Sequence, residues 1–193
     1  MTATPGDVTQ LLLQVKGHEP GAEARLLDLV YGELRKLAAS HMRRERVDHT
    51  LSATALAHEA WLRFGKALPE ADIYSRQQFF GVATTAMRRI LVEHARARRA
   101  EKRGGADRPL QVENLEAFSS PDDDQLIALD EALAALSELR PRAARVVELR
   151  FFGGFSHEQI GEFLGSERRT VDRDWAFARA WLLGALRREQ GNR

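Results

Sequence analysis

The chain of 193 residues contains no cysteine, which excludes disulfide bonds, cysteine-ligated metal sites and thiol catalysis and fits a reducing compartment. Long apolar runs are missing too. The longest stretch without Asp, Glu, Lys or Arg covers 11 residues, 77–87, whereas a membrane-spanning helix needs about 20 apolar residues. Residues 1–20 lack the basic start and apolar core of a secretion signal. We therefore expect a cytoplasmic protein that does not contact a membrane.

Lysine is scarce, because 25 of the 29 basic residues are arginine, and the planar arginine fork suits phosphate groups and guanine edges. The formal net charge of +1 hides a strong segregation along the chain. Residues 1–87 are neutral in sum, residues 88–108 carry +5, residues 109–139 carry −8 without any Lys or Arg, and residues 140–193 carry +4. Two basic blocks on either side of an acidic one indicate two contacts with a polyanion. For any single arginine, an ordinary solvated helix face is the alternative.

Alternating β-branched runs, the pattern of strands, are nearly absent, and apolar residues recur at helical spacing along most of the chain. Proline and glycine interrupt this spacing and set the expected helix ends. The pattern predicts helices over about 8–16, 22–46, 53–66, 76–100, 126–139, 141–152 and 157–164, and a last one from about 167.

Residues 104–124 differ in composition from the rest, because they are rich in Gly, Pro, Ser and Asp and end in three aspartates at 122–124. Such a segment has little apolar surface to bury and is typical of a linker. We predict an all-α fold of two helical domains, 1–103 and 125–193, joined by a flexible acidic linker over 104–124.

Residues 153–188 carry the most informative local pattern. Ser156 and Gln159 have the spacing of a capping box at the start of a short helix. Gly161 and Gly165 supply a small residue at a helix crossing and a glycine at the turn, which is the spacing of a helix-turn-helix whose second helix can enter the major groove. A structural helical hairpin is the alternative. The expected DNA-facing residues of the second helix are Arg168, Arg169, Thr170, Asp172, Arg173 and Arg179.

Catalytic and metal-binding patterns are lacking. Two His-Glu pairs, at 58–59 and 157–158, begin like a zinc-protease helix, but the second histidine of that motif is replaced by Leu62 and Gly161. No phosphate-cradling glycine loop and no supported Ser/His/Asp set is found. We expect no catalytic residues, no metal, no cofactor and no small-molecule substrate, and a helical enzyme is the least favoured alternative.

Three further motifs precede the helix-turn-helix in a fixed order. They are TALAHEAWLRF at 54–64, an apolar-to-basic helix that begins with two phenylalanines at 79–80 and continues as MRRILVEHAR at 87–96, and LRPR at 139–142 with VVELRFF at 146–152. Together these motifs resemble bacterial RNA polymerase sigma factors of the two-domain extracytoplasmic-function (ECF) type, over about residues 7–188.

The resemblance implies a dissociable specificity subunit that binds core RNA polymerase and directs transcription initiation at promoter DNA. It implies that the second domain reads the −35 element as duplex through the helix-turn-helix. The helix around 54–64 is implied to dock on the clamp helices of the largest polymerase subunit, through His58, Glu59, Leu62 and Arg63.

The resemblance also implies that the first domain holds the melted −10 element. The loop 67–76 is implied to capture a flipped base, with the readers Asp72, Tyr74, Ser75 and Arg76. The helix over 76–100 is implied to follow the non-template strand, with Arg88, Arg89, His94, Arg96, Arg98 and Arg99 near phosphates.

The sequence leaves the function and the partners partly open. An ordinary helix-turn-helix regulator that binds its operator without polymerase is the main alternative function. No anti-sigma partner is indicated by any motif. In the helix-turn-helix itself, Ser166 is expected to cap the second helix.

Overall fold

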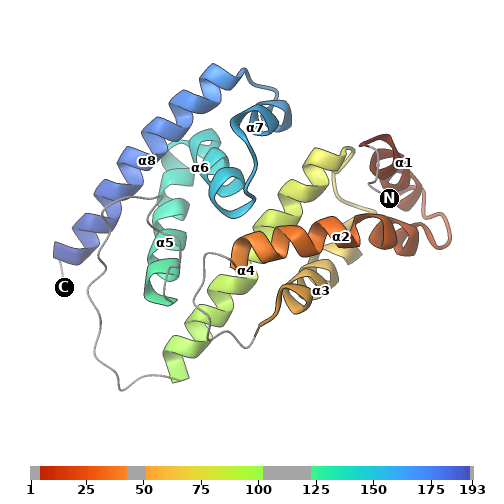
Figure 1. Ribbon diagram of the computed structural model, residues 1–193, viewed down its shortest axis with the longest axis horizontal. Helices are drawn as coiled ribbons and strands as arrows, with labels where there is room; N and C mark the ends of the chain where they lie inside the picture. Colours follow the sequence, from red (N-terminus) through yellow and green to blue (C-terminus); the bar gives the residue numbers. More distant parts are fainter. Residues whose placement is uncertain (1–4, 43–50, 102–122, 192–193) are drawn as a thin grey trace. The chain divides into compact units, whose positions relative to one another are not determined.

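The computed structural model describes residues 5–42, 51–101 and 123–191. Within these ranges the chain is largely helical and contains no strand, which confirms the predicted all-α fold class (Figure 1). A 3-10 turn, η1 (Gly65–Ala67), follows α3, and a π turn, η3 (Glu148–Phe152), follows α6. The α-helices are α1 (Pro5–Lys16), α2 (Ala22–Met42), α3 (Ala53–Phe64), α4 (Arg76–Glu101), α5 (Asp123–Leu139), α6 (Pro141–Val147), α7 (His157–Leu164) and α8 (Arg168–Gly191).

Two helices begin earlier than their apolar spacing predicts. α1 begins at Pro5, since proline fits the first position of a helix, where its missing N–H needs no partner. α5 begins with Asp123 and Asp124, because carboxylates in a first turn interact favourably with the helix dipole, by roughly 0.3–1 kcal/mol each. The predicted end of the second helix near 46 lies outside the described residues.

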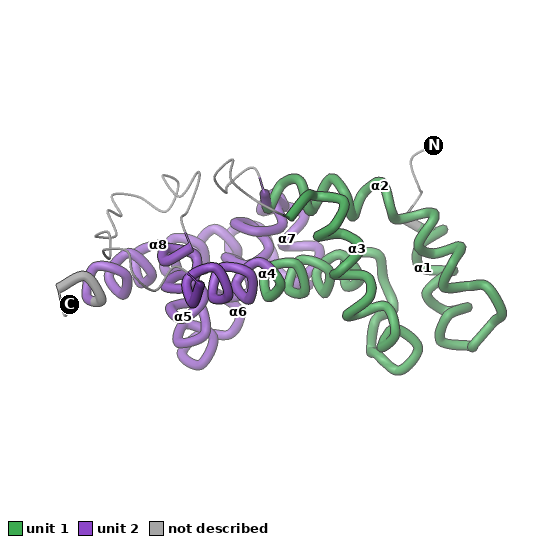
Figure 2. The backbone as a smooth tube through the Cα atoms, turned by 90° about the horizontal axis from the view of Figure 1, so that it is seen from below, with its two compact units in different colours: residues 1–41, 50–90 green, residues 42–49, 91–193 purple. Residues whose placement is uncertain are grey.

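The chain divides into two compact units, one from residues 1–41 and 50–90 and the other from 42–49 and 91–193 (Figure 2). Nearly all of the linker predicted over 104–124 lies outside the described residues. The division into domains at 1–103 and 125–193 therefore stays a prediction.

The core of the first unit combines one apolar stripe from each of its helices. An aromatic cluster occupies part of it: the ring centroids of Phe64 and Phe79 are 5.4 Å apart, and those of Phe79 and Phe80 are 5.2 Å apart. The side chains that are almost fully buried include Val8, Leu12, Leu26, Val30, Leu34, Leu56, Ala60, Phe79, Ala83, Met87 and Ile90.

In the second unit, α8 packs against α5, α6 and α7. Its buried stripe is Val171, Ala178, Leu182 and Leu186, which follows the predicted helical spacing. Each buried leucine or valine contributes about 1.5–3 kcal/mol. This stripe therefore fixes α8 in place and leaves its opposite face to solvent.

The predicted single helix over 141–152 is interrupted by η3, where the amide of Gly153 donates to the carbonyl of Glu148 at 3.2 Å. This wider turn leaves both Phe151 and Phe152 buried. A Cβ at Gly153 would lie 2.5 Å from the Phe155 ring and 2.7 Å from the carbonyl oxygen of Leu149, so the backbone after η3 leaves no room for a side chain at this position.

Candidate functional site

The start of α7 is a capping box, as the sequence predicts. The Ser156 hydroxyl accepts from the amide of Gln159 at 3.2 Å, and the Gln159 side chain accepts from the amide of Ser156 at 2.8 Å. Two amides that would otherwise lack partners are thus satisfied. This fixes the residue at which α7 begins.

The turn between α7 and α8, seen in Figure 1, depends on two glycines. Gly165 ends α7 in the left-handed region, at φ 60°. At Gly161 a Cβ would lie 2.7 Å from the carbonyl oxygen of Ser166, so the backbone after the turn passes directly over this residue. The expected cap at Ser166 is wrong. Its hydroxyl donates to the carbonyl of Leu164 at 3.4 Å, α8 begins at Arg168, and the amides of Thr170 and Val171 donate to the backbone carbonyl of Glu167.

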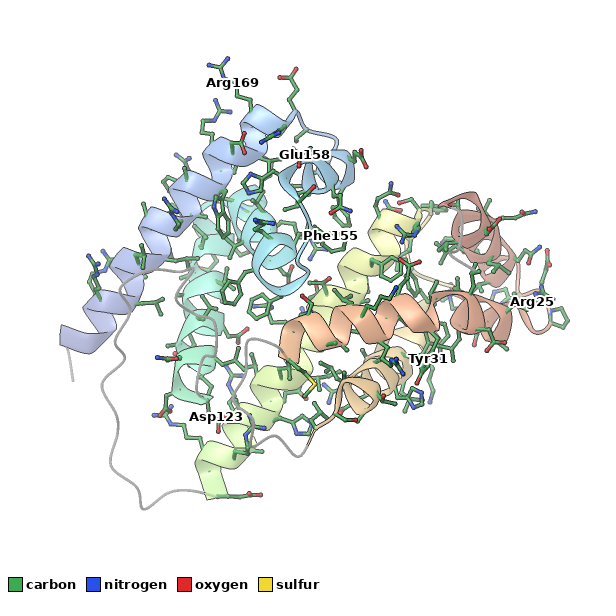
Figure 3. All side chains as sticks on the ribbon, viewed as in Figure 1. Arg25, Tyr31, Asp123, Phe155, Glu158 and Arg169 are labelled. Carbon is green, nitrogen blue, oxygen red and sulfur yellow. The ribbon has the colours of Figure 1, made fainter. Side chains whose placement is uncertain are left out.

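The exposed face of α8 carries the predicted DNA-facing residues. Thr170 and Arg179 are half-buried, and the other four are exposed. The side chains of Arg169, Thr170 and Arg173 form no hydrogen bond or ion pair with any residue that the structure describes. Figure 3 shows Arg169 extending outward from the first turn of α8.

The other predicted residues of the first turns, Arg168 and Asp172, are paired with α7. Arg168 Nη1 lies 2.5 Å from Glu158 Oε1 and its Nε lies 3.8 Å from Asp172 Oδ2. The Nδ1–H of His157 donates to Asp172 Oδ1 at 2.5 Å. The pKa of Glu158 lies below its ordinary value, first because its own backbone amide and the Ser156 hydroxyl bond to its carboxylate, and further because Arg168 lies nearby.

A second contact secures α8 against the start of α6. Arg142 Nε donates to the buried Asp174 at 2.5 Å, and this bond raises the pKa of Arg142. The guanidinium of Arg140 lies 3.9 Å from the centroid of the Phe177 ring. Asp174 was not predicted from the sequence, because no local pattern links it to an arginine 32 residues earlier.

The loop before α4 presents two of the predicted base readers. Tyr74 is 50% exposed, and its hydroxyl donates to Asp72 at 3.3 Å. The ammonium of Lys16 lies 4.4 Å from the centroid of the Tyr74 ring. Ser75 has a capping role instead, since its hydroxyl accepts from the amide of Gln78, whose side chain accepts from the amides of Tyr74 and Ser75.

The fourth predicted reader, Arg76, is bound within the first unit. Its guanidinium is hydrogen-bonded to Glu33 of α2 and lies 4.9 Å from the centroid of the Phe80 ring. Arg76 therefore joins α4 to α2 in the described structure. Asp72 and Tyr74 are the more exposed members of the predicted set.

The basic side chains of α4 fall into two groups. Arg89 is exposed, whereas Arg88 and His94 are half-buried. The three arginines nearest the end of α4 pair with aspartates of α5 within the second unit: Arg96 with Asp130 at 3.4 Å, Arg98 with Asp123 at 2.5 Å and Arg99 with Asp124 at 3.0 Å.

α3 presents an exposed apolar residue among polar ones. Leu62 is 65% exposed. Next to it, Arg63 Nη2 lies 2.6 Å from Oε1 of Glu59, one helical turn earlier. His58 of α3 is exposed, and its ring centroid lies 5.4 Å from the ring centroid of Tyr31 in α2. Of the four predicted polymerase-binding residues, His58, Leu62 and Arg63 are thus exposed and Glu59 is half-buried.

Neither a metal cluster nor a membrane span is found in the described ranges. No group of three or more His, Asp or Glu side chains there is arranged to hold a metal ion. None of the helices in these ranges is both long enough and apolar enough to cross a bilayer.

In a comparison with protein families, the family model described as ECF sigma factor matches residues 5–188. No curated protein matches the chain closely enough to be counted as a relative. The family match spans both compact units, including α3, α4 and the pair α7–α8.

Proposed function

The chain belongs to the ECF sigma factor family, and from this premise we propose that it reads duplex −35 DNA with α8 and stabilises melted −10 DNA with α4 and the loop before it. Members of the family act in transcription initiation as sigma factors on RNA polymerase, and the family is not an enzyme family. We infer that the chain works in the cytoplasm, where core polymerase is found, and that it supplies no catalytic residue, cofactor or metal.

The observation that carries the −35 assignment is the free face of α8. Arg169 and Arg173 are one helical turn apart and exposed, while Val171 and Ala178 bury the opposite face. A helix held in this way can enter the major groove with its first turns. The two arginines suit guanine edges or phosphates, and Thr170 can contact either.

The −10 assignment is supported by the exposed pair Tyr74 and Asp72. An aromatic face offers a stacking surface for an unstacked base, and a neighbouring carboxylate accepts hydrogen bonds from base amines. Ser75 supports this loop through its capping hydrogen bond to Gln78. Arg76 keeps the loop joined to α2.

Arg88, Arg89 and His94 are proposed to contact strand phosphates along α4. Phosphate contact by Arg96, Arg98 and Arg99 requires that these side chains exchange an aspartate of α5 for a phosphate group.

The polymerase-docking assignment is supported by Leu62. An exposed leucine flanked by the Glu59–Arg63 pair has the composition of an interface centre with a polar rim. The implied partner is the clamp of the largest polymerase subunit, with His58 at the edge of the same surface.

Transcription in vitro tests the proposal. Core polymerase is combined with the chain on a pool of genomic promoter fragments, and the initiated transcripts are sequenced. We expect transcripts that share a −35 and a −10 sequence and that are absent without the chain. Tight operator binding by the chain alone, with no polymerase-dependent transcripts, would favour an ordinary helix-turn-helix regulator.

A further inference from the structure

A four-residue polar network joins the first turn of α7 to the first two turns of α8. It consists of His157 and Glu158 from α7 and of Arg168 and Asp172 from α8. Three contacts link them: His157 to Asp172 at 2.5 Å, Arg168 to Glu158 at 2.5 Å and Arg168 to Asp172 at 3.8 Å. The network therefore lies at the end of α8 that is proposed to enter the DNA groove.

Asp172 lies directly beside the proposed DNA-reading residues. Residues three or four apart share a helix face, so Arg168 and Asp172 form one row, and Arg169 and Arg173 form the adjacent row. If α8 enters the major groove as proposed, a carboxylate in this position lies close to the DNA phosphates. The contacts to His157 and Arg168 hold it toward α7.

His157 is itself held in one orientation. Its side chain is 19% exposed, and its ring centroid lies 6.1 Å from that of Trp175. Because Asp172 is an acceptor, Nδ1 carries the proton, and the buried Nε2 has no hydrogen-bond partner among the described residues. The polar contact of this imidazole is thus directed to Asp172.

Loss of the His157 hydrogen bond would leave Asp172 with Arg168 alone, which is 3.8 Å away and already paired with Glu158. The Asp172 carboxylate could then turn toward Arg169 and Arg173 on the DNA-facing surface of α8. Like charges that meet in an interface oppose binding strongly. In a DNA complex, the Asp172 carboxylate would meet the negatively charged phosphate backbone. The hydrogen bond from His157 keeps the Asp172 carboxylate away from the phosphates, and His157 itself need not contact DNA.

We propose that His157 is a positioning residue for −35 recognition: it holds the Asp172 carboxylate against α7 and keeps this charge off the DNA-facing surface of α8. The charged groups around the imidazole are Asp172, Glu158 and Arg168. The inference rests on the proposed function of α8.

A double-mutant cycle tests it. The dissociation constant of the holoenzyme, core polymerase with the full chain, is measured on a promoter that the wild type transcribes, for His157→Phe, Asp172→Asn and the double variant. Phenylalanine keeps an aromatic ring beside Trp175 but cannot donate. We expect His157→Phe to weaken binding about tenfold in the wild-type chain. In the Asp172→Asn background the same change should have little effect, so that the double variant keeps the affinity of Asp172→Asn.

Two controls separate charge placement from folding. His18→Asn changes an exposed histidine of the first unit, at φ 54°, a backbone conformation that asparagine tolerates, and should leave the affinity unaltered. His157→Asn can still donate to Asp172 and should bind within about threefold of wild type.

The inference is overturned if His157→Phe binds like wild type, if it weakens the Asp172→Asn chain as much as the wild-type chain, or if a folded His157→Asn loses tenfold. A wild-type holoenzyme that selects no promoter overturns the proposed function and this inference with it.

Discussion

Single residues decide whether the two helices α7 and α8 can meet. Gly161 is the clearest case, because the carbonyl of Ser166 occupies the space where a side chain would begin. The glycine, the capping box and Gly165 were all identified from sequence, since each acts on residues within five positions of itself. Asp174 and the pairing of Asp172 with His157 were not identified, because they join residues 32 and 15 positions apart.

Gly161→Ala should destabilise the second unit. The added Cβ would lie 2.7 Å from a backbone oxygen that cannot move without opening the turn. We expect the free energy of unfolding to fall by about 1–3 kcal/mol, the usual cost of overpacking, as measured by urea denaturation.

Gly32→Ala is the matched control, because nothing lies within 4 Å of its Cβ position on an exposed part of α2. That variant should gain roughly 0.5–1 kcal/mol from helix propensity. Equal stability of Gly161→Ala and wild type would contradict the close approach.

Arg169→Ala and Arg173→Ala should separate base reading from phosphate contact. We expect a loss of about 1–3 kcal/mol of promoter discrimination, concentrated at one base pair for each arginine. The measurement is holoenzyme affinity for single-position promoter variants across a salt series. Arg187→Ala, an exposed arginine near the far end of α8, is the control and should change neither quantity. Uniform weakening at every sequence with a shallower salt slope would assign the side chain to phosphate instead.

At the scale of elements, the helices followed from apolar periodicity, while their irregular parts did not. η3 has no sequence pattern of its own, and it arises where the chain must bury Phe151 and Phe152 together. The apolar spacing predicts the start of α5 three residues late, because Asp123 and Asp124 have the composition of a linker although they suit the first turn of a helix.

The ion pairs between α4 and α5 give an element-scale prediction. Asp123 and Asp124 form ion pairs with Arg98 and Arg99, two arginines that are proposed to contact the melted strand. Asp123→Asn with Asp124→Asn should therefore raise the affinity of the free chain for single-stranded DNA. The salt slope should become steeper by about 0.7 for each additional phosphate that the freed arginines neutralise. Fluorescence anisotropy at several salt concentrations measures both the affinity and the slope.

Glu131→Gln with Glu138→Gln provides a matched control for that prediction. It removes the same charge from exposed positions of α5. If both double variants raise the affinity equally, overall charge is responsible and the specific pairing is not.

At the scale of the whole molecule, the charge balance bears on how the protein finds its target. A chain with a net charge of +1 gains little from nonspecific attraction to DNA, which depends on neutralising phosphates with basic residues. The proposed division of labour therefore requires polymerase to bring the two DNA-binding surfaces to a promoter.

Glu59→Ala with Leu62→Ala should weaken binding to core polymerase at least about tenfold while leaving the fold intact, since interface centres carry most of the binding energy. Leu62 is 65% exposed, so its loss removes little core packing. Affinity for immobilised core polymerase is the measurement. Leu13→Ala, a leucine 53% exposed on α1, is the control. Unchanged binding of the α3 variant would contradict the docking assignment.

Footprinting of one promoter by the chain alone, by core polymerase alone and by both together tests the central claim most directly. We expect protection of the −35 duplex and permanganate-reactive, unpaired thymines at −10 only when both are present. Full protection by the chain alone, or melting at −10 that does not depend on the chain, would contradict the account.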